Sequence, residues 1–246
     1  MPLLRLPIVR GVIDRRVLVN YRVDPDVLQR QLPAPFRVAT VGGFGIAGIC
    51  LIRLVHARPR GVPRWLGLRS ENAAHRVAVT GPGARGDREG VYVVRRDTSS
   101  FWNALVGGRL FPGVHHRAAF RVDERDDAVA IHLTSRDGAT AVGLRGRAVA
   151  ALPPGSVFAD VAAASSFFER GALGWSPAAR RGCYDCLELK SFAWRVEPLA
   201  VEHARSSWLE DPARFPAGSV TFDSALLMRG IEHEWRAHER LDAELC

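Results

Sequence analysis

The sequence contains little lysine, little cysteine and no long hydrophobic run. Lys190 is its one lysine, although lysine and arginine together number 34. Four cysteines in 246 residues are too few for a disulfide framework, so we expect free thiols. The longest apolar stretch, residues 43–52, is about half the ~20 residues that a bilayer-spanning helix needs. Charges and prolines interrupt the N-terminal segment where a secretory signal would be apolar, so these absences predict a cytoplasmic protein without a membrane partner.

The charge of the chain is strongly positive but evenly distributed. The formal net charge is +8, and the arginines are spread along the whole length without alternating with aromatic residues. This distribution argues against a nucleic-acid partner, because such proteins gather basic residues on one face. A net positive field instead favours anionic small molecules.

Short apolar segments separated by Gly, Pro and Asp predict a chain made mostly of β-strands. The predicted strands cover residues 16–21, 44–55, 75–80, 90–94, 116–122, 128–133, 141–150, 187–196 and 219–228. Their regular spacing indicates a mainly antiparallel sheet or barrel. Helix signals are fewer: caps and stops predict helices over residues 24–32, 97–107 and 156–170, and charges at i,i+4 spacing predict a solvated helix from residue 230 onward.

Two motifs that suggest a cofactor or a metal are better explained structurally. GFGIAG at residues 43–48 matches a dinucleotide fingerprint, but β-branched residues follow it where a helix should begin, so the glycines are expected to relieve crowding in a bent strand. Cys183 and Cys186 form a C-x-x-C pair, yet His233 and His238 are too distant in sequence for a zinc finger. We therefore expect neither a metal nor a cofactor.

Three stretches in the first half of the chain resemble the acetoacetate decarboxylase superfamily. They are NYRVDPDVLQRQLPAPF at residues 20–36, LGLRSENAAHRVAV at 66–79 and ALVGGRLFPGVHHRAAF at 104–120. Within the superfamily, SENAAHR, RRDTSS, GGRLFPGVHH and SSFFERGALGWSP look most like the YqjF-like domain of unknown function, an uncharacterised branch. The resemblance implies one α+β domain over residues 1–246, mainly antiparallel β, with a closed or nearly closed barrel and peripheral helices.

The resemblance also implies an active site in which the family's Schiff-base lysine is absent. Arg22 and Glu71 stand at the positions of the family's active-site arginine and glutamate, but His115-His116 stands where the family has Pro-Lys. An imidazole cannot condense with a ketone to form an iminium. We therefore expect acid–base catalysis, with His116 as the inward-facing proton carrier, Glu71 as partner acid, and Arg22 bound to Glu71 or to a substrate carboxylate. A purely structural Arg22–Glu71 ion pair is the alternative.

Four further residues are expected to contact the ligand. His115 does so unless strand alternation leaves it in solvent, and Arg96 does so if it is the inward arginine of its pair. Arg109 keeps the family's Gly-Arg pair, although it could instead cap a helix end. Lys190 could form a Schiff base from another wall, or lie on a solvated face.

These features predict an enzyme that acts next to the carbonyl of a small carbonyl or carboxylate compound. Dehydration, cyclisation, isomerisation and decarboxylation all fit this chemistry. The alternative is a non-catalytic protein that binds or senses such a ligand. Family analogy also makes a homo-oligomer plausible.

Overall fold

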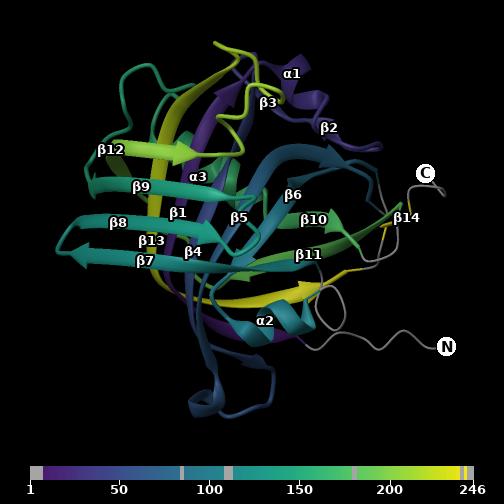
Figure 1. Ribbon diagram of the computed structural model, residues 1–246, viewed down its shortest axis with the longest axis vertical. Helices are drawn as coiled ribbons and strands as arrows, with labels where there is room; N and C mark the ends of the chain where they lie inside the picture. The colour runs from purple at the N-terminus through teal and green to yellow at the C-terminus, as the bar shows by residue number, and fades with distance from the viewer. Residues whose placement is uncertain (1–7, 84–85, 108–112, 179–181, 239–240, 243–246) are drawn as a thin grey trace.

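The computed structural model describes residues 8–83, 86–107, 113–178, 182–238 and 241–242 (Figure 1). The helices are α1 (Pro25–Gln29), α2 (Phe101–Val106) and α3 (Val161–Arg170), with a 3-10 turn, η1, at Arg64–Leu66. The strands are β1 (Val9–Val23), β2 (Arg37–Val38), β3 (Thr40–Val41), β4 (Phe44–Pro59), β5 (Leu68–Gly81), β6 (Arg88–Thr98), β7 (His115–Arg125), β8 (Ala128–Ser135), β9 (Ala141–Ala148), β10 (Leu173–Pro177), β11 (Cys183–Ser191), β12 (Glu197–Ser206), β13 (Val220–Ala237) and β14 (Leu241–Asp242).

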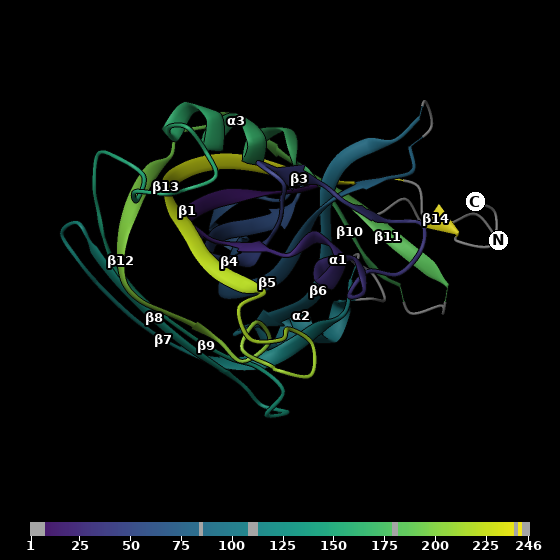
Figure 2. The same cartoon turned by 90° about the horizontal axis from the view of Figure 1, so that it is seen from above.

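The strands form one sheet that closes on itself twice. Strands β13, β1, β4, β5 and β6 form a shared wall. Strands β7, β8, β9 and β12 close a nine-strand ring on this wall, and β10 and β11 close a seven-strand ring on it (Figure 2). Apart from the parallel pairs β6–β7 and β6–β10, the pairings within these rings are antiparallel. The predicted mainly antiparallel barrel with peripheral helices is therefore confirmed.

Both rings can close because two strands of the wall change partner along their length. Strand β6 pairs with β10 at residues 91–92 and with β7 at residues 96–98. Strand β13 pairs with β12 at residues 226–227 and with β11 at residues 233–237. The sheet thus forks at both edges of the wall.

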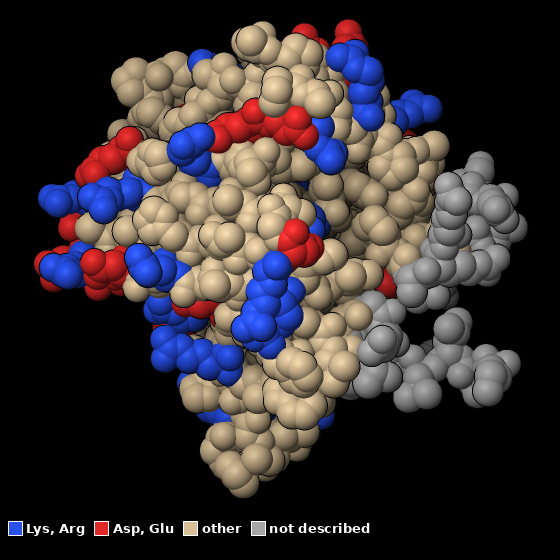
Figure 3. Space-filling model, viewed as in Figure 1, with Lys and Arg blue, Asp and Glu red and all other residues tan. Residues whose placement is uncertain are grey.

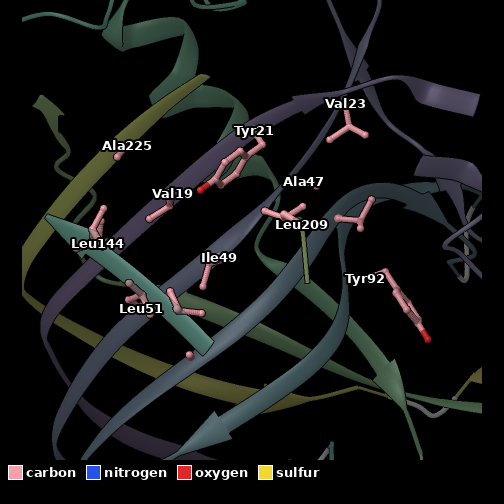
Figure 4. Packing of buried hydrophobic residues seen from close by; sticks show 14 of the residues in the cluster. Val19, Tyr21, Val23, Ala47, Ile49, Leu51, Tyr92, Leu144, Leu209 and Ala225 are labelled. Atoms are coloured by element: carbon pink, nitrogen blue, oxygen red, sulfur yellow. The ribbon is translucent and has the colours of Figure 1, made fainter. Parts of the chain in front are cut away.

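The shared wall is buried on both faces, because successive side chains of a strand point to opposite sides. On β4, Ile49 and Leu51 face the nine-strand ring and belong to the same core cluster as Leu144 of β9 (Figure 4). Cys50 and Ile52, at the alternate positions, belong to the second core cluster, which α3 also joins. Burial on both faces explains the nearly continuous apolar run of this strand.

The glycines of GFGIAG permit close packing within β4. A Cβ atom on Gly48 would lie 2.1 Å from the backbone oxygen of Val19, and one on Gly45 would lie 2.7 Å from the Leu28 side chain. The whole motif from Phe44 onward is strand, and no helix begins in it. The expected relief of crowding is confirmed, and the dinucleotide alternative is excluded.

Two helix predictions need correction. The segment from residue 230 onward is the second half of β13, because β1 and β11 both pair with it and Ile231 and His233 are buried. Helix α3 begins at Val161 rather than near residue 156, because the Asp223 carboxylate accepts hydrogen bonds from the Ser156 hydroxyl and the Val157 amide and holds them in a turn. The cap predicted at Asp24 is observed, whereas Ser100 caps α2.

Basic and acidic side chains are interspersed on the face shown in Figure 3, over β7, β8, β9 and β12. No continuous basic surface covers this face. Among the described residues, no helix has the length and apolar character that crossing a membrane requires.

The contact at Gly48 provides a test of the shared wall. We expect Gly48→Ala to lower the free energy of unfolding by about 3 kcal/mol or more, because backbone atoms must move to admit the methyl group. Gly174→Ala is the matched control, since a Cβ there meets no atom closer than 3.7 Å. Urea unfolding followed by fluorescence measures both, and similar losses would contradict the close approach.

Candidate functional site

A cavity of about 530 Å³ lies inside the seven-strand ring. Each of the seven strands contributes to its lining, with Arg16 from β1, Cys50 from β4, Arg76 from β5, Arg96 from β6, Gly174 from β10, Leu187 from β11 and Trp235 from β13. Phe168 of α3 and Asn103 of α2 also line it. This volume is in the range typical of small-ligand sites.

Four arginines, Arg16, Arg58, Arg76 and Arg96, line the cavity together with Lys190 and the carboxylates Asp97, Glu169 and Glu188. The Arg58 side chain donates to the backbone carbonyls of His56 and Val62. Arg16, Arg76 and Arg96 occupy lining positions on three strands of the shared wall. The Arg76 side chain donates to the Asn20 amide oxygen and lies over the Phe168 ring, 4.9 Å from its centroid. The Nε and Nη1 atoms of Arg76 and the Nη1 atom of Arg16 are buried without a hydrogen-bond partner.

Arg16, Arg76 and Arg96 are not paired with carboxylates as buried cations normally are, although the nearby Asp185 partly offsets the charge of Arg96. Within the described part of the chain, no Asp or Glu forms an ion pair with Arg16, Arg76 or Arg96. Burial lowers the pKa of both Arg76 and Arg96 to about 10. Both guanidinium groups are nonetheless charged at neutral pH, and the five cationic residues of the lining outnumber its three carboxylates.

His115 adds a neutral ring to the cavity lining. Its Nδ1 lies 2.9 Å from the carbonyl oxygen of Gly113 and must carry the proton, because a carbonyl only accepts. Burial, and then the nearby Arg96, lower the pKa of His115 to about 3. The ring is therefore neutral at physiological pH, with its unprotonated nitrogen at Nε2.

The cavity also has an apolar part away from Arg16, Arg76 and Arg96. Val9 of β1 pairs with Trp235 and with Pro59, and Leu189 pairs with Trp235 from the other side. All four residues line the cavity, and Val9 is seven positions along β1 from Arg16. The cavity thus joins a cationic part to an apolar part.

The predicted site residue Glu71 belongs to an ion-pair cluster outside this lining. It binds Arg15 and Arg53, and both arginines also bind Glu124 of β7. Arg15 is completely buried and forms ion pairs with the carboxylates of Glu71 and Glu124. The structural alternative, a buried ion pair, holds for Glu71, but its partners are Arg15 and Arg53 rather than Arg22.

Arg22 and His116 lie in two further sets of contacts. Arg22 donates to the Gly155 carbonyl and lies over the Phe44 ring. His116 is partly exposed, with Nδ1 3.3 Å from Asp137. The expected convergence of Arg22, Glu71 and His116 on one cavity is not observed. The inward member of the histidine pair is His115, because the strand alternates in the opposite phase to the one expected.

The structure describes three of the four residues that were expected to contact a ligand. His115 and Arg96 line the cavity, whereas Arg95 turns away to bind Asp97 and Asp137. Lys190 also contributes to the lining but is exposed, with its ammonium group over the Phe192 ring. Arg109 lies outside the described residues.

The C-x-x-C residues are separate buried thiols. Cys183 and Cys186 are free and buried on β11. Burial raises the pKa of Cys186 to about 11, so this thiol is protonated at neutral pH. In the described ranges, no group of three or more His, Cys, Asp or Glu side chains is placed to hold a metal ion.

A family model matches most of the chain. The model is DUF2071, whose description is "uncharacterized conserved protein", and it covers residues 13–208. The chain belongs to the DUF2071 family. A comparison with curated proteins gives no match.

Solved structures resemble this DUF2071 protein along almost its full length. An acetoacetate decarboxylase-like enzyme from Sphingomonas wittichii RW1 superposes with a TM-score of 0.60 at 14% identity, covering 96% of this chain and 93% of that one. Acetoacetate decarboxylase from Legionella pneumophila superposes with a TM-score of 0.61 at 12% identity, over 98% and 93%. The enduracididine biosynthesis enzyme MppR, solved with pyruvate, gives 0.59 at 10% identity, over 98% and 92%. The DUF2071 protein therefore has the acetoacetate decarboxylase-like fold.

The difference between paired and unpaired arginines can be measured as stability. We expect Arg96→Met to leave the free energy of unfolding unchanged or to raise it by about 1 kcal/mol, because it removes a charge that forms no ion pair with any described residue. Arg53→Met should lower it by about 2 kcal/mol, because Glu71 and Glu124 lose a partner. Urea denaturation without ligand measures both, and equal losses would contradict the assignment.

Proposed function

We propose that this DUF2071 protein binds a small carboxylate compound in the cavity of the seven-strand ring and transfers a proton next to its carbonyl group. The observation that carries the proposal is the buried, incompletely hydrogen-bonded guanidinium of Arg76, close to Arg16 and Arg96. A carboxylate bound in the cavity would supply the missing negative charge beside these guanidinium groups.

The apolar part of the cavity indicates the shape of the ligand. A carboxylate at the arginines would direct the rest of the molecule toward Trp235, Leu189 and Val9. Small-ligand sites commonly combine a few polar groups that fix orientation with apolar walls that contribute affinity. We therefore propose a carboxylic acid with an apolar body and a carbonyl group close to the acid.

Proton transfer in this proposal falls to His115. Its low pKa makes the free protein a poor proton donor, but a carboxylate bound beside Arg96 would offset the positive charge that helps to lower this pKa. His115 could then accept a proton from the carbon next to the carbonyl and return it elsewhere, as a lyase or an isomerase does. No cofactor is part of this proposal.

The second candidate function is ligand binding without turnover. It is favoured by the same low pKa of His115, because a ring that stays neutral after binding would only accept a hydrogen bond. Glu71, the expected partner acid, belongs to the separate cluster with Arg15 and Arg53. Turnover assays with labelled solvent protons separate the two functions.

The binding site can be tested with one ligand and two arginine variants. We expect phenylpyruvate to bind in isothermal titration calorimetry, and its neutral methyl ester to bind at least about tenfold more weakly. Arg76→Gln should weaken phenylpyruvate binding by about tenfold or more. Arg22→Gln, outside the cavity, should leave it unchanged. Equal affinity for acid and ester, or equal effects of the two substitutions, would contradict the proposal.

The affinity should also depend on pH through His115. If the bound carboxylate raises the pKa of His115 from about 3, the complex holds a proton more tightly than the free protein does. Affinity then rises as pH falls through the raised pKa of the complex toward about 3, and binding takes up protons in this range. Calorimetry in buffers of different ionisation enthalpy measures this uptake. His115→Gln should remove it, and proton release by the native protein would contradict the coupling.

A further inference from the structure

We infer that Cys50 is a nucleophile of the cavity, whose thiol adds to the keto carbon of a bound 2-oxo acid. The inference rests on the proposed function, because the arginines must hold the acid beside the sulfur. It extends that function by naming a covalent step and a narrower ligand class.

The strand register places Cys50 in the polar part of the cavity. Cys50 of β4 pairs with Ala74 of β5, Ala74 pairs with Arg96 of β6, and Arg96 pairs with His115 of β7. All four residues line the cavity. The small side chain of Ala74 separates the sulfur from the guanidinium and the imidazole, so a ligand lying over Ala74 would contact all three groups.

Positive groups surround the Cys50 sulfur. The Nε atom of Arg16 donates to Sγ at 3.2 Å. Burial lowers the pKa values of Arg76 and Arg96, and in each case the nearby Cys50 opposes that effect. The sulfur therefore lies within electrostatic range of Arg16, Arg76 and Arg96, which would attract an anionic electrophile to it.

A second observation, independent of the cysteine, indicates a ligand at this place. Arg76 is only 3% exposed, and its Nε and Nη1 atoms have no partner. The chain thus places donors for an anion and a nucleophile in one cavity. Lys190, the amine expected from another wall, lies exposed.

The two other described cysteines are suitable internal references. Cys183 and Cys186 are both buried on β11, and neither lines the cavity. Burial raises the pKa of Cys186 to about 11, which keeps it in the unreactive thiol form. Selective chemistry at Cys50 would therefore report on the cavity rather than on general thiol exposure.

The covalent step needs no other reagent. A bond forms between the Cys50 sulfur and the keto carbon, the carbonyl π bond breaks, and its electron pair goes to the oxygen. The thiol proton is transferred to that oxygen, which gives a reversible thiohemiketal with an uncharged hydroxyl and the carboxylate still ionised. Nothing is oxidised or reduced.

The charge of the surroundings is tested by alkylation. Iodoacetate and iodoacetamide transfer similar groups to a thiol but differ in charge. We expect the iodoacetate-to-iodoacetamide rate ratio at Cys50 to exceed that of free cysteine by about tenfold or more. Arg76→Met should remove this preference and Arg22→Met should keep it. Peptide mapping by mass spectrometry locates the label. A ratio equal to that of free cysteine, or earlier labelling of Cys183 or Cys186, would overturn the inference.

The covalent step is tested with phenylpyruvate carrying ¹³C at its keto carbon. We expect a protein-bound NMR signal of a tetrahedral carbon, which is absent with Cys50→Ala and Cys50→Ser. If both variants and the native protein bind phenylpyruvate in calorimetry and give only the keto signal, the inference is wrong and the proposed function stands. If the native protein binds no carboxylate at all, the proposed function fails and this inference fails with it.

Discussion

The whole structure depends on one wall of five strands that serves two rings. Because side chains alternate along a strand, each of these strands contributes side chains to the interiors of both rings. On β4, Ala47, Ile49 and Leu51 complete the core of the nine-strand ring, while Cys50 and its even-numbered neighbours face the seven-strand ring. The forks in β6 and β13 allow both rings to close on this wall.

The two ring interiors differ in how their buried arginines are compensated by acidic residues. At the nine-strand ring, Arg15 and Arg53 are compensated by Glu71 of β5 and Glu124 of β7. In the seven-strand ring, the buried guanidinium of Arg76 has neither a carboxylate partner nor a full set of acceptors. Buried ion pairs are a usual structural device, whereas a buried cation without a counterion is costly to maintain. This contrast is the reason for assigning function to one interior and support to the other.

Much of the fold could be predicted from sequence, because strand periodicity and turn residues are local signals. The candidate site was less accessible. Arg76 stands inside an apolar strand in AAHRVAV, a pattern that identifies a buried charge but not which ring it faces or whether a carboxylate meets it. The phase of the histidine pair could not be read from sequence either, since it depends on how β7 joins β6. The prediction of a solvated helix after residue 230 was wrong because charged residues of this segment pair with residues of another strand. The ion pair between Arg10 of β1 and Glu234 of β13 is an example.

The alternation of β4 and β5 has a consequence for how such a protein can diversify. Substitutions at Cys50, Ala74 or Arg76 alter the lining of the cavity, while Ile49, Leu51 and Val77 on the opposite face continue to hold the larger core. Selection for new ligands and selection for folding therefore act on different residues of the same strands. A chain built on this wall can therefore change the groups that line its cavity without rebuilding its scaffold.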